Sequence, residues 1–69
     1  MDKKIKKNLQ ELNILYVEDE EGVRVPFSMM LKRVVKNLYV AENGEIGLKL
    51  FKKYPIDVII SDIKMPKMT

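Results

Sequence analysis

The chain has 69 residues, no cysteine and no histidine, and a formal net charge of +3. This length allows one small domain with a marginal hydrophobic core, and the lack of cysteine excludes a disulfide that would stabilise it. The missing histidine removes the commonest general base, and no apolar stretch approaches the roughly 20 residues of a membrane span or resembles a signal peptide, so we expect a cytoplasmic protein without membrane contact.

Residues 1–11 are expected to form a basic lead-in segment. Residues 1–7 contain four lysines and one aspartate, which leaves nine basic and nine acidic side chains in the remainder of the chain. A basic arm can contact nucleic acid or a membrane surface, but for so short a tract we favour a solubilising leader. Ile5, Leu9 and Leu12 lie at helical spacing and predict a short helix over residues 4–12.

The first strand and the first helix follow. The run Ile14-Leu15-Tyr16-Val17 predicts a strand over residues 13–18. A short β-branched run of this kind, like the later Val58-Ile59-Ile60-Ser61, is typical of a strand buried on both faces. Apolar residues then recur at steps of three and four and predict an amphipathic helix; they are Val23, Phe27, Met30, Leu31, Val34 and Val35. Pro26 is disfavoured beyond a first helical turn, so we expect the helix to begin near residues 22–25 or to bend there.

The second half of the chain repeats this alternation. Residues 38–41 predict a strand, Asn43 is a candidate N-cap for a helix with Glu45 in its first turn, and that helix should end at Tyr54-Pro55. Residues 57–61 predict a third strand. The order β-α-β-α-β indicates an α/β fold with a parallel sheet and right-handed crossovers. No later element covers the apolar third strand, so we expect it to pair or swap with another chain.

Acidic residues follow the first and third strands. Glu18-Asp19-Glu20 come directly after the first strand, and Asp62 comes directly after the third. If these strands are neighbours in a parallel sheet, their carboxyl ends meet at one edge, where open α/β sheets bind ligands. Carboxylates gathered there repel one another unless a cation lies among them, and Mg²⁺ is the natural occupant. An aspartate beside such an ion can act as a nucleophile and form an aspartyl phosphate.

These residues together resemble the receiver domain of bacterial two-component response regulators. The resemblance is carried by Ile14-Leu15-Tyr16-Val17-Glu18-Asp19-Glu20, by Ala41-Glu42-Asn43-Gly44-Glu45-Ile46-Gly47-Leu48, and by Asp57-Val58-Ile59-Ile60-Ser61-Asp62-Ile63-Lys64-Met65-Pro66. It covers residues 12–69. It implies a flavodoxin-like, doubly wound parallel sheet with strand order 2-1-3, of which this chain holds the β-α-β-α-β half, completed by pairing with another chain.

The resemblance also implies site residues and a function. By position, Asp62 would be the phosphoacceptor, Asp19 a direct Mg²⁺ ligand and Glu18 a ligand through a bound water. The backbone carbonyl of Lys64 would be a further ligand, and Pro66 would shape the loop. The implied role is Mg²⁺-dependent phosphorylation by a sensor histidine kinase in signalling, without enzymatic turnover. Nucleic acid would be contacted only through an output domain outside this chain.

The same resemblance implies that residues 12–69 are a truncated receiver domain. Members of this family have five strands and five helices, with a switch hydroxyl after the fourth strand and a phosphate-binding lysine after the fifth. Neither group has a counterpart here, and Thr69 lies in a different loop. We therefore expect phosphoryl stabilisation and signalling to be impaired in this chain.

Other interpretations of the same residues stay open. Aspartate-nucleophile phosphatases also place an aspartate beside Mg²⁺, but they need a second acid two positions later, where this chain has Lys64. A half-domain that only associates through its third strand is a further possibility. Taken singly, Asp62 is typical of a carboxylate that caps a turn, while Glu20 and Glu21 favour the dipole of the following helix.

Overall fold

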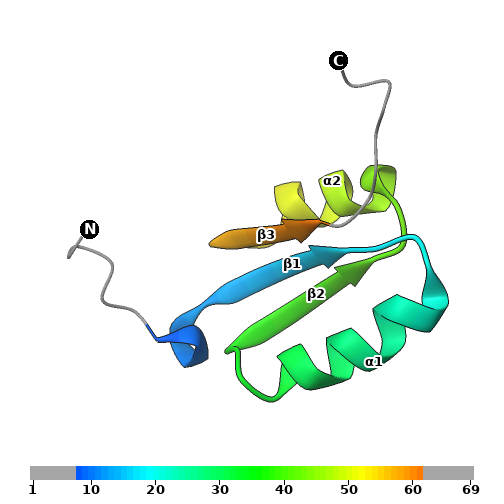
Figure 1. Cartoon of the computed structure of the whole chain (residues 1–69). Coiled ribbons are helices and arrows are strands. Elements are labelled where there is room, and N and C mark those ends of the chain that lie inside the picture. The colour runs from blue at the N-terminus through cyan, green and yellow to red at the C-terminus, as the bar shows by residue number, and fades with distance from the viewer. Residues whose placement is uncertain (1–7, 62–69) are drawn as a thin grey trace, which may run out of the picture.

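The computed structural model describes residues 8–61 and shows three strands and two α-helices (Figure 1). The elements are the 3₁₀ turn η1 (Leu9–Glu11), β1 (Asn13–Val17), α1 (Glu21–Lys32), β2 (Asn37–Ala41), α2 (Gly44–Lys53) and β3 (Val58–Ser61). The three strands are parallel and lie in the order β2-β1-β3, which confirms the predicted fold class and strand order. The helix expected over residues 4–12 is seen only as η1, and residues 1–7 lie outside the described part.

The register of the sheet aligns the carboxyl ends of its strands. Val17, the last residue of β1, is paired with Ala41 at the end of β2 and with Ser61 at the end of β3. The last residues of the three strands therefore lie at the same edge of the sheet. This alignment is the geometric condition for the ligand site that the sequence predicts.

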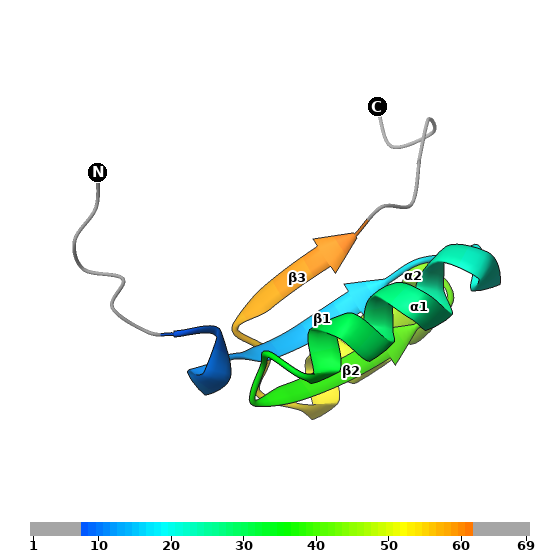
Figure 2. The same cartoon turned by 60° about the horizontal axis from the view of Figure 1, so that its bottom comes forward.

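The two helices lie on opposite faces of the sheet, with α1 in front and α2 behind in Figure 2. Successive residues of a strand point to opposite faces, so alternate residues of β1 pack toward the two helices. Leu15 and Val17 join Ala41 in a core cluster with residues of α2, whereas the ring of Tyr16 meets that of Phe27 from α1 edge-on, with 5.0 Å between centroids. β1 is thus buried on both faces, as predicted.

Helix α1 departs from the prediction at its start. It begins at Glu21 and continues through Pro26 to Lys32, so the expected start near residues 22–25 is wrong by one residue. Proline at this position removes the N–H that would bond to the carbonyl of Gly22, and Gly22 is exposed, so water can satisfy that carbonyl. The predicted apolar face is only partly buried: Leu31 is covered, but Met30 is 51% exposed.

Helix α2 follows the prediction closely. The Asn43 side chain accepts a hydrogen bond of 2.8 Å from the amide of Ile46, which confirms it as the N-cap, and the helix ends at Lys53 before Tyr54-Pro55. Neither α1 nor α2, the two α-helices within residues 8–61, is long and apolar enough to span a membrane.

Strand β3 differs from β1 because it lies at the outer edge of the described sheet (Figure 2). Val58 is 39% exposed and Ile59 is 51% exposed. Burial on both faces, expected for a short β-branched run, is therefore wrong for β3, since the helices pack mainly on β1 and β2. Within residues 8–61, no further strand pairs with the outer edge of β3.

Close packing of α2 on β1 gives a prediction about stability. A Cβ at Gly47 would meet the Val17 side chain at 3.0 Å, whereas one at Gly22 would meet nothing within 4 Å. We expect Gly47→Val to lower the free energy of unfolding by about 1–3 kcal/mol through overpacking. Gly22→Ala, the control, should raise it by up to about 1 kcal/mol. Urea unfolding measures both, and equal stability of the two variants would contradict the packing described.

Candidate functional site

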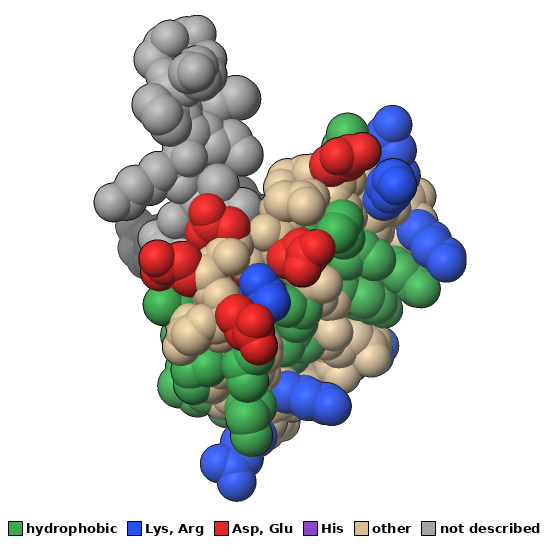
Figure 3. Space-filling view, turned by 90° about the vertical axis from the view of Figure 1, so that its right-hand side faces the viewer, with side chains coloured by type: hydrophobic (Ala, Val, Ile, Leu, Met, Phe, Trp, Pro, Cys, Tyr) green, Lys and Arg blue, Asp and Glu red, His purple; other side chains and the backbone are tan. Residues whose placement is uncertain are grey.

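The carboxyl edge of the sheet is rich in acidic side chains. Figure 3 looks onto this side, toward which the strand arrowheads of Figure 1 point, and shows several acidic side chains with a basic side chain among them. Glu18 and Asp19 enter this edge directly from β1. A site at this place would have a strongly negative potential that attracts cations.

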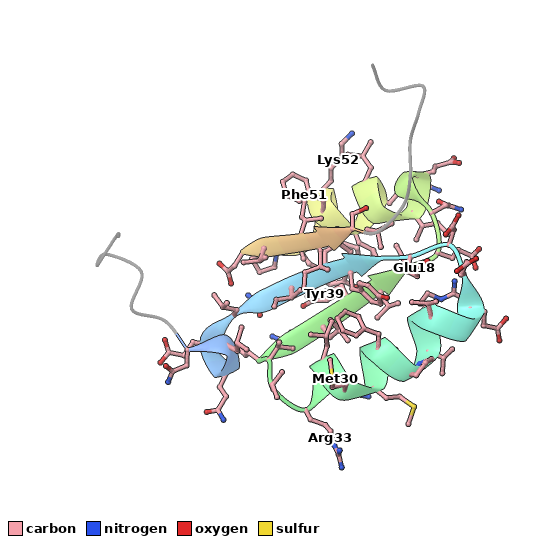
Figure 4. The ribbon with its side chains drawn as sticks, viewed as in Figure 1. Glu18, Met30, Arg33, Tyr39, Phe51 and Lys52 are labelled. Carbon is pink, nitrogen blue, oxygen red and sulfur yellow. The ribbon has the colours of Figure 1, made fainter. Side chains whose placement is uncertain are left out.

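Glu18 is the buried member of this group, with 3% of its surface exposed (labelled in Figure 4). Its amide donates a 3.0 Å hydrogen bond to the carbonyl of Ala41 in β2. Its carboxylate Oε2 accepts a 3.1 Å bond from the amide of Glu20, and its backbone carbonyl accepts a 3.0 Å bond from Nη1 of Arg24. Main chain and side chain are therefore both held in place.

The second carboxylate oxygen of Glu18 is the unusual atom of the site. Oε1 is buried and has no hydrogen-bond partner among residues 8–61. Leaving a buried acceptor unsatisfied costs about 1–3 kcal/mol, so such atoms in folded proteins call for an explanation. A hydrated divalent cation fits this donor set, because it prefers carboxylate and carbonyl oxygens and retains waters that can donate to Oε1.

The neighbouring acids have different surroundings. Asp19 is exposed, so its carboxylate is open to an ion from solvent. Glu20 is the N-cap residue of α1, where its backbone carbonyl accepts bonds from the amides of Val23 and Arg24, but its side chain makes no capping bond. Glu21 lies in the first helical turn, where a negative charge favours the helix dipole.

The other predicted site residues belong to the C-terminal end of the chain. Asp62, Lys64 and Pro66 lie outside the described residues, so their roles stay predictions. Residue 62 follows Ser61, which is paired with Val17, so β3 leads the chain toward the edge that holds Glu18. Within residues 8–61 alone, no three side chains of the metal-binding types gather into a cluster.

Arg24 is a site residue that the sequence analysis missed. It lies near the N-terminal end of α1, where a cation is unfavourable to the helix dipole. The signal in the sequence was a positive charge near the start of a predicted helix, six residues after Glu18, the first acid of the run. The apolar spacing that predicts this helix takes no account of its charged residues, so it gives Arg24 no weight.

The chain matches known proteins over most of its length. Residues 14–69 match the response regulator receiver domain family. The chain is also similar to proteins named cell cycle response regulator CtrA from Brucella ovis, Brucella anthropi and Brucella abortus, each 33% identical over 58 residues. The match covers 84% of this chain and 25% of each relative.

No solved structure matches the chain significantly. The family match covers most of the chain, and the parallel sheet in the order β2-β1-β3 has Glu18 and Asp19 at its carboxyl edge. The chain therefore belongs to the response regulator receiver domain family of two-component signalling.

Proposed function

We propose that this chain carries the phosphoacceptor site of a response regulator, with Asp62 as the residue phosphorylated by a sensor histidine kinase. The observation that carries the proposal is the buried carboxylate of Glu18, whose Oε1 has no partner among the described residues. The pairing of Val17 with Ser61 supports it, because the last residue of β3, which precedes Asp62 in the sequence, lies beside the last residue of β1. In this proposal the site serves signalling, because the phosphorylated aspartate is itself the product and no separate substrate is converted.

The residues have separate tasks in this proposal. Asp19, Asp62 and the carbonyl of Lys64 would hold Mg²⁺ directly, Glu18 would hold it through a water, and Pro66 would shape the loop. When bound, the ion neutralises charge on the phosphoryl oxygens. A carboxylate oxygen of Asp62 then forms a bond to phosphorus while the bond to the phosphohistidine nitrogen breaks and leaves its electron pair on the imidazole.

Incubation of the protein with Mg²⁺ and acetyl phosphate tests this proposal. We expect the intact mass to increase by one phosphoryl group, which peptide mapping assigns to Asp62. Asp62→Asn is the matched control and should show no increase, because an amide is not a nucleophile of this kind. Incorporation that persists in this variant, or that requires no Mg²⁺, would contradict the proposed site.

A second candidate function is association through β3. Ile59 is half exposed, and an apolar groove of about 540 Å³ lies between α2 and β3, lined by residues that include Leu48 and Phe51. An exposed apolar edge strand is a template for pairing with another strand. We propose that the 69-residue chain forms a homodimer or a swapped oligomer through this edge.

The chain spans about a quarter of the length of the curated relatives that it matches. A cognate kinase, an output domain that reaches nucleic acid and a cytoplasmic location are therefore proposals for the whole protein. They follow from the family and from the similarity to proteins named as response regulators.

A further inference from the structure

We propose that Arg24 is a positioning residue for the cation site: it fixes the backbone at Glu18 so that the site is formed before an ion binds. The inference rests on the Mg²⁺ site proposed above. It concerns a residue that would not contact the ion, since its side chain reaches the backbone carbonyl of Glu18 at 3.0 Å.

The contacts around Glu18 show why one hydrogen bond can matter. The amide of Glu18 is held by Ala41, and its Oε2 accepts from Glu20. The carbonyl of Glu18 belongs to the peptide that leads into Asp19, and Arg24 is the residue that holds this carbonyl. Rotation of that peptide would turn the carbonyl of Glu18 and the amide of Asp19 together, and the resulting shift of the Asp19 backbone would displace the next amide, that of Glu20. The orientation of both carboxylates therefore depends on this anchor.

The second argument is that Arg24 donates to a backbone carbonyl and not to a carboxylate. A guanidinium so near several carboxylates could pair with one of them, and it would then compete with a metal ion. In the described structure Arg24 Nη1 instead donates to a neutral carbonyl, while Oε1 of Glu18 stays without a partner. The half-buried side chain thus places positive charge beside the acidic run without using the oxygens that a cation would need.

A purely electrostatic role for Arg24 predicts the opposite effect of its removal on Mg²⁺ affinity. If the guanidinium acted only through its charge, it would repel Mg²⁺, and removing it would tighten binding. If it acts by holding the carbonyl, removing it weakens binding. Arg24→Met removes charge and donors at similar length, Arg24→Lys keeps the charge and a donor, and Arg33→Met removes a positive charge from the exposed other end of α1 as the control.

Amide NMR of the 69-residue protein gives two readouts. Without metal, the Glu20 amide in Arg24→Met should exchange with solvent faster relative to the buried Leu15 amide, which separates local loosening from global unfolding. With Mg²⁺, the Asp19 amide shift should give a Kd raised about tenfold in Arg24→Met, as is typical for residues that orient metal ligands. Arg24→Lys should recover most of the affinity, and Arg33→Met should match the unaltered protein.

The outcomes separate the two proposals. Unchanged or tighter Mg²⁺ binding by Arg24→Met would overturn the role of Arg24 and leave the metal site intact. An unaltered protein without saturable Mg²⁺ shifts would overturn the metal site; the metal-free exchange of Glu20 would then decide whether Arg24 holds the backbone. If Arg24→Met does not fold, Arg24→Gln, which is neutral, is judged by the same two readouts.

Discussion

Replacing Glu18 by glutamine is expected to make the metal-free protein more stable and to weaken its response to Mg²⁺. The buried Oε1 has no partner among residues 8–61, and Glu18 is 3% exposed. An amide of the same shape removes the carboxylate charge from this buried position, and its oxygen can still accept from the amide of Glu20. Its NH2 group then takes the unpartnered position of Oε1, so the gain comes from the lost charge alone. We expect a gain of about 1–2 kcal/mol in the free energy of unfolding.

The stabilisation that Mg²⁺ provides should be smaller in Glu18→Gln than in the unaltered protein. At a Mg²⁺ concentration about 100 times the Kd, binding to the folded state stabilises a protein by about 2.7 kcal/mol. A Kd raised about tenfold by Glu18→Gln would reduce this gain to about 1.4 kcal/mol. Asp19→Asn should have a larger effect, because this exposed carboxylate is proposed to contact the ion directly.

Thermal unfolding with and without Mg²⁺ measures both effects. For a domain of this size, each kcal/mol corresponds to a shift of about 4–8 °C in Tm. Glu11→Gln is the control, since it removes the same charge from an exposed position in η1, ahead of the amino end of β1. A loss of metal-free stability in Glu18→Gln would show that the carboxylate is satisfied in solution and would remove the main support for the ion site.

Replacing Ile59 by lysine is expected to dissociate the proposed oligomer. Ile59 is 51% exposed on the edge strand and lines the groove beside α2. Burying an isoleucine side chain contributes about 1.5–3 kcal/mol, and a lysine on an edge strand opposes further strand pairing. Because each 1.4 kcal/mol changes an equilibrium constant tenfold, the dimer Kd should rise at least about tenfold.

Sedimentation equilibrium at micromolar concentration provides the measurement. The unaltered protein should sediment as a dimer or larger species, and Ile59→Lys should shift toward the monomer. Val25→Lys is the matched control, because Val25 is 45% exposed on α1, which lies on the opposite face of the sheet from α2. A folded monomer in the unaltered protein would exclude this association, and equal effects of both lysines would indicate a general gain in solubility.

Much of the fold could be predicted because its signals are local. The apolar run before Glu18 defines β1, and Asn43 marks the start of α2 through a bond to an amide three residues away. Alternation of strands and helices then leaves few topologies, because parallel crossovers are right-handed. Pro26 was misjudged for the same local reason: propensity disfavours it, but an exposed carbonyl at Gly22 lowers its cost.

The amino-acid sequence by itself determined the order of the elements, the family resemblance and the placement of acids after two strands. Tertiary structure alone decided that Glu18 is buried while Asp19 is exposed, and that Arg24 holds the Glu18 carbonyl. The reason is physical: helix and strand patterns repeat over a few residues, whereas the burial of Glu18 depends on β2, which is 23 positions away at Ala41 and is brought near only by folding.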